Sequence, residues 1–175
     1  MAQKKKNTEL TLAAVKKQAK EAYEQDSYEL DNGSTIKYYV RFPDLKVEDM
    51  YEELQKHYIE MKKEDINLSD KMNLYFINLL MIKHFTHFKK DMPDELLGKG
   101  TKAGLLDYLN HFADTGLMKT IMDEVFVPDQ VRKVYEKMTD ILGASKLLQE
   151  MESSVQKKYT DMKIKHKLED KVVNK

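Results

Sequence analysis

The sequence contains no cysteine and no tryptophan, and only six glycines and three prolines among its 175 residues. Without cysteine the chain cannot form disulfides, a cysteine-ligated zinc site or an iron–sulfur cluster, and it has no thiol nucleophile. It also lacks any apolar run near the roughly 20 residues of a membrane-spanning helix. The first residues, Met-Ala-Gln-Lys-Lys-Lys, are not followed by the apolar core of a secretory signal. We therefore expect a cytoplasmic protein that is not secreted and has no membrane partner.

Charged side chains are plentiful and balanced, with 30 Lys and Arg against 30 Asp and Glu, but they are unevenly placed. Residues 1–20 carry six Lys and one Glu, and residues 156–175 carry seven Lys and three acidic residues. The middle of the chain is consequently acidic. Basic ends around an acidic body are typical of solvated tails, and they could also act as electrostatic arms for nucleic acid or for an acidic partner.

The length is that of one domain, and the pattern predicts three regions. Residues 1–26 form a basic N-terminal helix or extension, residues 27–155 form a single domain, and residues 156–175 form a basic tail. Within the domain we expect a β-hairpin over 27–42 and a helical bundle over 44–155. The predicted fold class is mainly α, with a small N-terminal hairpin packed on about five or six short helices.

The hairpin is indicated by Asn32-Gly33, a pair that favours a two-residue type I′ turn with positive φ at both positions. The arm that follows alternates in character, as a strand with one buried face does. One face carries Ile36, Tyr38, Val40 and Phe42, and the other carries Lys37, Tyr39 and Arg41. A lone hairpin is marginal in water, so this one must pack on the helices or on another sheet.

Residues 9–25 contain neither Gly nor Pro and include four Ala, which favours a helix. Its apolar stripe is thin and consists of Leu12, Val15, Ala19 and Tyr23. A helix with so narrow a stripe gains little from packing on its own domain. We expect it to fray or to await a partner.

The bundle is predicted from apolar residues at spacings of three and four. After Pro43 the stripe is Val47, Met50, Leu54, Tyr58 and Met61. Ser69 or Asp70 can cap the next helix, which runs through Phe88 and is apolar on every side over residues 79–82, as a buried central helix is.

Capping residues, glycine and proline divide the rest of the bundle into shorter helices. Thr101 is the expected N-cap of the following helix, and Gly116 its C-terminal stop. A short helix follows over residues 117–126. Pro128 can be the first residue of another helix, and a last apolar segment covers residues 147–155.

No catalytic or metal site is predicted. His84 and His87 are three apart and could bind metal with Asp91 or His111, but no recognised ligand spacing completes such a set. The acidic pairs 48–49, 52–53 and 123–124 are placed as a solvated face would be. The loop 98–102 resembles a phosphate loop only in composition. We therefore expect no enzyme activity and no cofactor.

The run from Tyr28 to Pro43, followed by an acidic helix, a helical body and a charged tail, resembles the tail assembly chaperones of long-tailed bacteriophages and prophages. The resemblance covers residues 27–150 as an order of elements and is specific only in the hairpin. It implies a non-enzymatic factor of the host-cell cytoplasm that binds the tape measure protein, with the tail-tube protein as a second partner. It also implies that the chain could form a homo-oligomer.

Under that hypothesis, the partner-binding residues are expected on the hairpin and the first bundle helix. They are Ile36, Tyr38, Tyr39, Val40, Arg41, Phe42 and Tyr58. The same residues could instead belong to the core. The alternative function is a nucleic-acid-associated phage or bacterial regulator that acts through the basic ends, although the acidic body disfavours nucleic acid.

Overall fold

The computed structural model describes residues 9–138. The chain divides into two compact units, 1–132 and 133–175. Near the end of the first unit a helix begins at Pro128, the position predicted from the sequence. In the second unit only residues 133–138 are described, and they are helical. The predicted apolar segment 147–155 and the basic tail 156–175 lie outside the described residues, as do residues 1–8 of the Lys-rich start.

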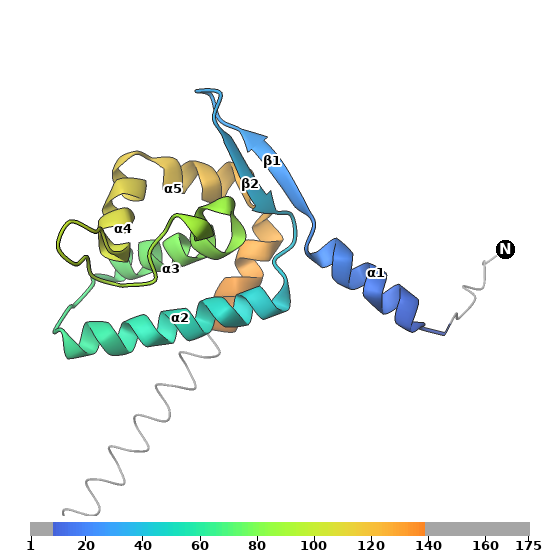
Figure 1. The fold of residues 1–175 in the computed structure, drawn as a ribbon, viewed down its shortest axis with the longest axis horizontal. Helices are drawn as coiled ribbons and strands as arrows, with labels where there is room; N and C mark the ends of the chain where they lie inside the picture. The colour runs from blue at the N-terminus through green and yellow to red at the C-terminus, as the bar shows by residue number, and fades with distance from the viewer. Residues whose placement is uncertain (1–8, 139–175) are drawn as a thin grey trace, which may run out of the picture. The chain divides into compact units, whose positions relative to one another are not determined.

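The first unit is mainly α with one antiparallel hairpin, as predicted (Figure 1). Among the described residues its elements are α1 (Leu12–Ala22), β1 (Gln25–Glu29), β2 (Thr35–Tyr39), α2 (Asp44–Lys63), α3 (Asp70–Phe85), the 3₁₀ helix η1 (His87–Lys90), α4 (Leu105–Asp114), α5 (Leu117–Thr120) and the π-helical turn η2 (Ile121–Val125). None of the helices in the described part of the chain combines the length and apolar character needed to cross a bilayer.

The hairpin turn differs from the predicted type I′ turn. Gln25 pairs with Tyr39 and Glu29 with Thr35, and the Leu30 N–H donates to the Ser34 carbonyl at 2.8 Å. Three residues therefore turn the chain, and only the last of them, Gly33, has a positive φ, of 78°. Asn32 is not at positive φ, and its side-chain oxygen accepts the Ser34 N–H at 2.9 Å. A three-residue loop needs the left-handed conformation at one position only, which glycine supplies.

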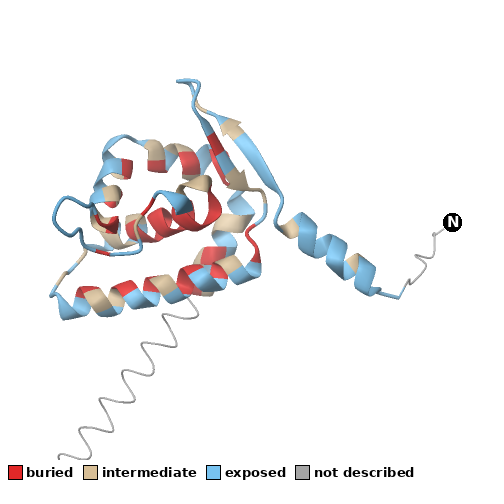
Figure 2. Ribbon diagram, in the orientation of Figure 1, coloured by how far each residue is buried: buried red, intermediate tan, exposed pale blue. Residues whose placement is uncertain are grey.

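Helix α1 is shorter than predicted and buries none of its residues (Figure 2). Its N-terminus is capped by Thr11, whose hydroxyl accepts the Ala14 N–H at 3.2 Å. Leu12 is 82 % exposed and Val15 is 44 % exposed. The prediction of a thin, unburied stripe is confirmed for Leu12, Val15 and Ala19. Tyr23, the fourth predicted member, follows the helix, and its ring meets Tyr39 edge-on with centroids 6.4 Å apart.

The core is centred on α3, in which every residue from Phe76 to Phe85 is buried. This confirms the prediction of a central helix. The helix ends at Phe85 rather than Phe88, because Thr86 leaves the helical conformation and caps η1. Phe42 stacks on Phe85 with ring centroids 3.8 Å apart and meets Phe126 edge-on at 5.0 Å. These rings fasten the end of the hairpin arm to α3 and η2.

The segment before α4 corrects one capping prediction. The N-cap is Gly104 rather than Thr101, and the Asp107 carboxylate accepts the Gly104 N–H at 2.8 Å. A Cβ atom on Gly104 would lie 2.4 Å from the backbone nitrogen of Gly98, so glycine is required where the chain crosses itself. Gly116 has a φ of 72° after the last turn of α4, as the predicted stop requires.

Candidate functional site

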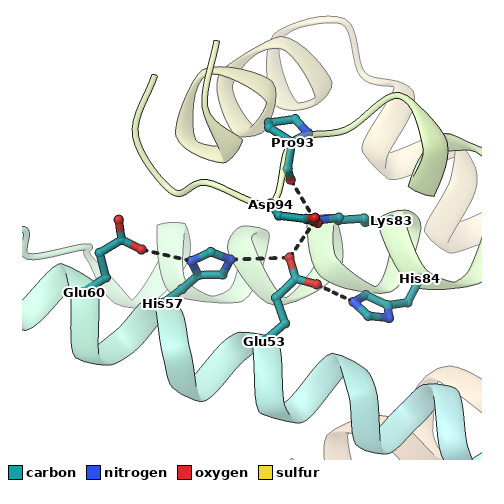
Figure 3. Close-up of polar contacts among 7 residues, drawn as sticks. All are labelled: Glu53, His57, Glu60, Lys83, His84, Pro93 and Asp94. Carbon is teal, nitrogen blue, oxygen red and sulfur yellow. Dashed lines mark hydrogen bonds and ion pairs between the residues drawn. The ribbon is translucent and has the colours of Figure 1, made fainter. Parts of the chain in front are cut away.

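The most concentrated chemistry in the first unit is an ionic cluster between α2 and α3 (Figure 3). Lys83 of α3 is fully buried, and its ammonium donates to Glu53 Oε1 at 2.7 Å, to the Pro93 carbonyl at 2.7 Å and to Asp94 Oδ1 at 2.6 Å. His84 Nε2 donates to the other oxygen of Glu53 at 2.6 Å. Glu53 thus binds two cationic or polar side chains of α3 at once.

His57, one turn after Glu53 on α2, completes the cluster. Its ring is fully buried and lies edge-on to Phe76, with centroids 5.8 Å apart. Nε2 is 3.4 Å from Glu53 Oε1, and Nδ1 is 3.5 Å from Glu60 Oε2. The cluster therefore extends along α2 for two turns, from Glu53 to Glu60.

The electrostatics of the cluster favour an ionised carboxylate and a neutral imidazole. Burial alone would raise the pKa of Glu53, but hydrogen bonds from His57, His84 and Lys83 outweigh it and hold that pKa well below its usual range. Burial lowers the pKa of His84, and the bond to Glu53 offsets only part of this effect. At neutral pH His84 is uncharged, and its Nε2–H donates a hydrogen bond to the ionised carboxylate of Glu53.

This arrangement is suited to holding elements together rather than to catalysis. The three protons of the Lys83 ammonium all have acceptors, so the amine is not available as a nucleophile or a base. Within residues 9–138, no three His, Asp or Glu side chains are placed to share a metal ion. The cluster joins α2, α3 and the segment at residues 93–94 through side chains that would be costly to bury alone.

Two sequence predictions are corrected by this cluster. Glu53 was assigned to a solvated face, but it faces α3, and its side chain is 14 % exposed. His84 and His87 do not share a helical face, because α3 ends between them. His84 is buried at Glu53, whereas Nδ1 of His87 accepts the Lys37 N–H at 3.3 Å.

The predicted partner-binding residues divide into two groups. Ile36 and Phe42 are 1 % and 2 % exposed and belong to the core. The others reach the surface, where Arg41 is exposed and Tyr38, Tyr39, Val40 and Tyr58 are half-buried. For these five, partner contact stays a prediction.

A groove of about 670 Å³ lies between the hairpin turn and the α4–α5 region. Its apolar lining includes Leu30, Ile36, Phe88 and Leu117. Among the residues that the structure describes, the charged ones that line it are Asp31 and Glu124, with no Lys or Arg. The Tyr28 hydroxyl donates to Glu124 Oε2 at 2.6 Å, a bond that raises the pKa of Tyr28 and links the hairpin to η2. The sequence predicted the hairpin and the helices that line this groove, but not that they lie next to each other.

Besides the groove, the apolar stripe of α1 is a second exposed surface within residues 9–138. On a helix of 3.6 residues per turn, Leu12, Val15 and Ala19 share one side. Lys16 and Lys20 lie along one flank of that stripe. Lys17 lies on the far side, where its ammonium is 3.8 Å from Glu21 Oε1. We call the three stripe residues and their two flanking lysines the α1 stripe.

A family model described as YomO matches residues 12–175, and the family is of the phage and prophage type. No curated protein and no solved structure matches the chain.

Proposed function

The chain belongs to the YomO family, and from that premise we propose that it is a non-enzymatic assembly chaperone of a tailed phage, which binds the tape measure protein during tail assembly. The observation that carries this proposal is the α1 stripe, an apolar helix face that no other residue within 9–138 buries.

The energetics of α1 support a binding role. The helix has 11 residues, and isolated helices shorter than about 12–15 residues are marginal in water. Most helices in proteins are stabilised by tertiary packing of an apolar face, and α1 has no buried residue to supply it. A partner that covers Leu12 and Val15 would provide that packing.

The form of the α1 stripe also defines the partner's chemistry. Apolar residues at positions i, i+3 and i+7 are the anchors of a helix that lies against another helix or in a groove. The lysines on one flank favour a partner segment whose apolar seam is bordered by acidic residues. A long helical protein such as a tape measure protein offers seams of this kind along its length.

The test is co-expression of the chain with the tape measure protein of the same phage, followed by size-exclusion chromatography with light scattering. We expect the tape measure protein to stay soluble and to co-elute with several copies of the chain. The double variant Leu12→Ser/Val15→Ser should lose co-elution, because it removes the apolar anchors of α1.

The matched control is Leu45→Ser/Ile59→Ser, since these two side chains of α2 are also exposed, at 70 % and 57 %. Equal loss with both double variants would contradict the role of α1. A tape measure protein that precipitates with or without the chain would overturn the proposed function. DNA or RNA affinity that falls steeply with salt would then favour the alternative of a nucleic-acid-associated regulator.

A further inference from the structure

We propose that the chain self-associates by reciprocal exchange of α1. The α1 stripe of one copy occupies, in a second copy, the groove between the hairpin turn and the α4–α5 region. The first unit contains a basic, apolar helix face and an acidic, apolar groove, and no residue within 9–138 covers the first or fills the second.

The groove is suited to a helix of the α1 type. Its volume of about 670 Å³ lies within the range of sites that enclose a ligand or several side chains. The apolar lining can receive Leu12 and Val15. Asp31 and Glu124 provide negative charge. No Lys or Arg of the described part of the chain lines the groove, so none of these side chains already neutralises the two carboxylates that an incoming lysine would meet.

The α1 stripe carries the complementary charge. Lys16 and Lys20 border the apolar residues on one flank, so both could reach acidic groups at the groove margin while Leu12 and Val15 enter it. Two α1 helices would repel each other, because the helix has three lysines and one glutamate. An α1 helix therefore matches the groove better than it matches another α1 helix.

The connection within one chain disfavours intramolecular docking. Only Tyr23 and Glu24 separate α1 from β1, so the helix is joined to the hairpin at the end opposite its turn. The groove lies at the turn end, where Asp31 and Asn32 line it. Exchange between two copies avoids this constraint, and a reciprocal exchange closes with two-fold symmetry instead of forming a filament.

The test measures self-association of the purified full chain, in the absence of the tape measure protein, by sedimentation equilibrium over a range of concentrations. We expect a monomer–dimer equilibrium for the wild type. Lys16→Glu and Asp31→Lys should each weaken dimerisation about tenfold or more, because each places like charges together in a partly desolvated contact. The combination Lys16→Glu/Asp31→Lys should restore dimerisation to within about threefold of the wild type.

Two controls separate this contact from a general effect of charge. Lys17→Glu is the control for Lys16→Glu and lies on the far side of α1. Glu29→Lys is the control for Asp31→Lys and lies on β1 outside the groove. Both should leave the dimer dissociation constant within about threefold of the wild type. A chain that stays monomeric at every concentration would overturn the proposal, as would a double variant no better than its single parents.

The result is independent of the proposed function, because the tape measure protein is absent from the experiment. If both proposals hold, the tape measure protein competes with the groove for the α1 stripe, and adding it lowers the dimer fraction. A dimer that forms in a chain unable to bind the tape measure protein would leave the exchange of α1 intact and overturn only the chaperone function.

Discussion

Helices α1 and α3 place opposite kinds of side chain in the environments where each is least expected. The Lys-rich α1 leaves Leu12 82 % exposed, whereas the apolar α3 buries the ammonium of Lys83 completely. A local interaction, the Thr11 cap, maintains α1, and the exposed pair between Lys17 and Glu21 adds little to it. Contacts from other elements maintain α3. A helix held by local interactions leaves its surface available for binding, whereas a helix held by tertiary contacts depends on every group packed around it.

The largest expected effect is on the α3 side of this comparison. Lys83→Met should lower the free energy of unfolding by about 3–5 kcal/mol, because it leaves Glu53 buried without its main cation and the Pro93 carbonyl without its donor. Urea denaturation followed by circular dichroism measures this loss. Lys62→Met, at an exposed position near the end of α2, is the control and should change stability by less than about 0.5 kcal/mol. Equal values for the two variants would show that the buried cluster does not stabilise the fold.

Acidification should weaken the same cluster in two steps. The pKa values of His84 and Glu53 are both lowered by folding, so the unfolded chain binds more protons than the folded chain as the pH falls. Their stabilisation is present above the ordinary pKa of each group and is lost below it. We expect the urea midpoint to fall as the pH drops below about 6.5, and to fall further below about 4.3.

The first of these steps is assigned by the variant His84→Gln, whose side-chain amide can still donate to Glu53 but does not titrate. The slope of stability against pH between about 5 and 6.5 should decrease in this variant. His111→Gln, at an exposed position, is the matched control and should keep the wild-type slope. If His84→Gln keeps that slope too, another group controls the first step.

The smallest effect on stability is expected at α1. Leu12→Ser should change the free energy of unfolding by no more than about 0.5 kcal/mol, because the side chain contributes nothing to the core. The same urea measurement tests this. A loss above 1 kcal/mol would mean that Leu12 packs on its own chain, and the contrast between α1 and α3 would fail.

Features that depend on neighbouring residues were predictable from the sequence. The run of apolar residues over 79–82 indicated a helix buried on every side, and α3 is buried from Phe76 to Phe85. Gly116 indicated the end of α4, and Pro128 the beginning of the next helix. Each of these signals acts within one or two turns, through the backbone conformation or the periodicity of side chains, so no distant contact was needed to read it.

The predictions that were wrong concern features that depend on contacts between residues far apart in the sequence. The spacing of Glu53 placed it opposite the apolar stripe of α2, and its burial follows only from Lys83 and His84, which α3 brings to it from 30 and 31 residues away. The groove likewise joins Tyr28 to Glu124 across 96 residues. By itself the sequence determined the helices, the hairpin and the unpacked character of α1, because these follow from short-range backbone and periodicity rules. Only the tertiary structure decided which charges are buried and which surfaces face each other, because the free energy of a buried charge depends on partners that the packing of distant segments supplies.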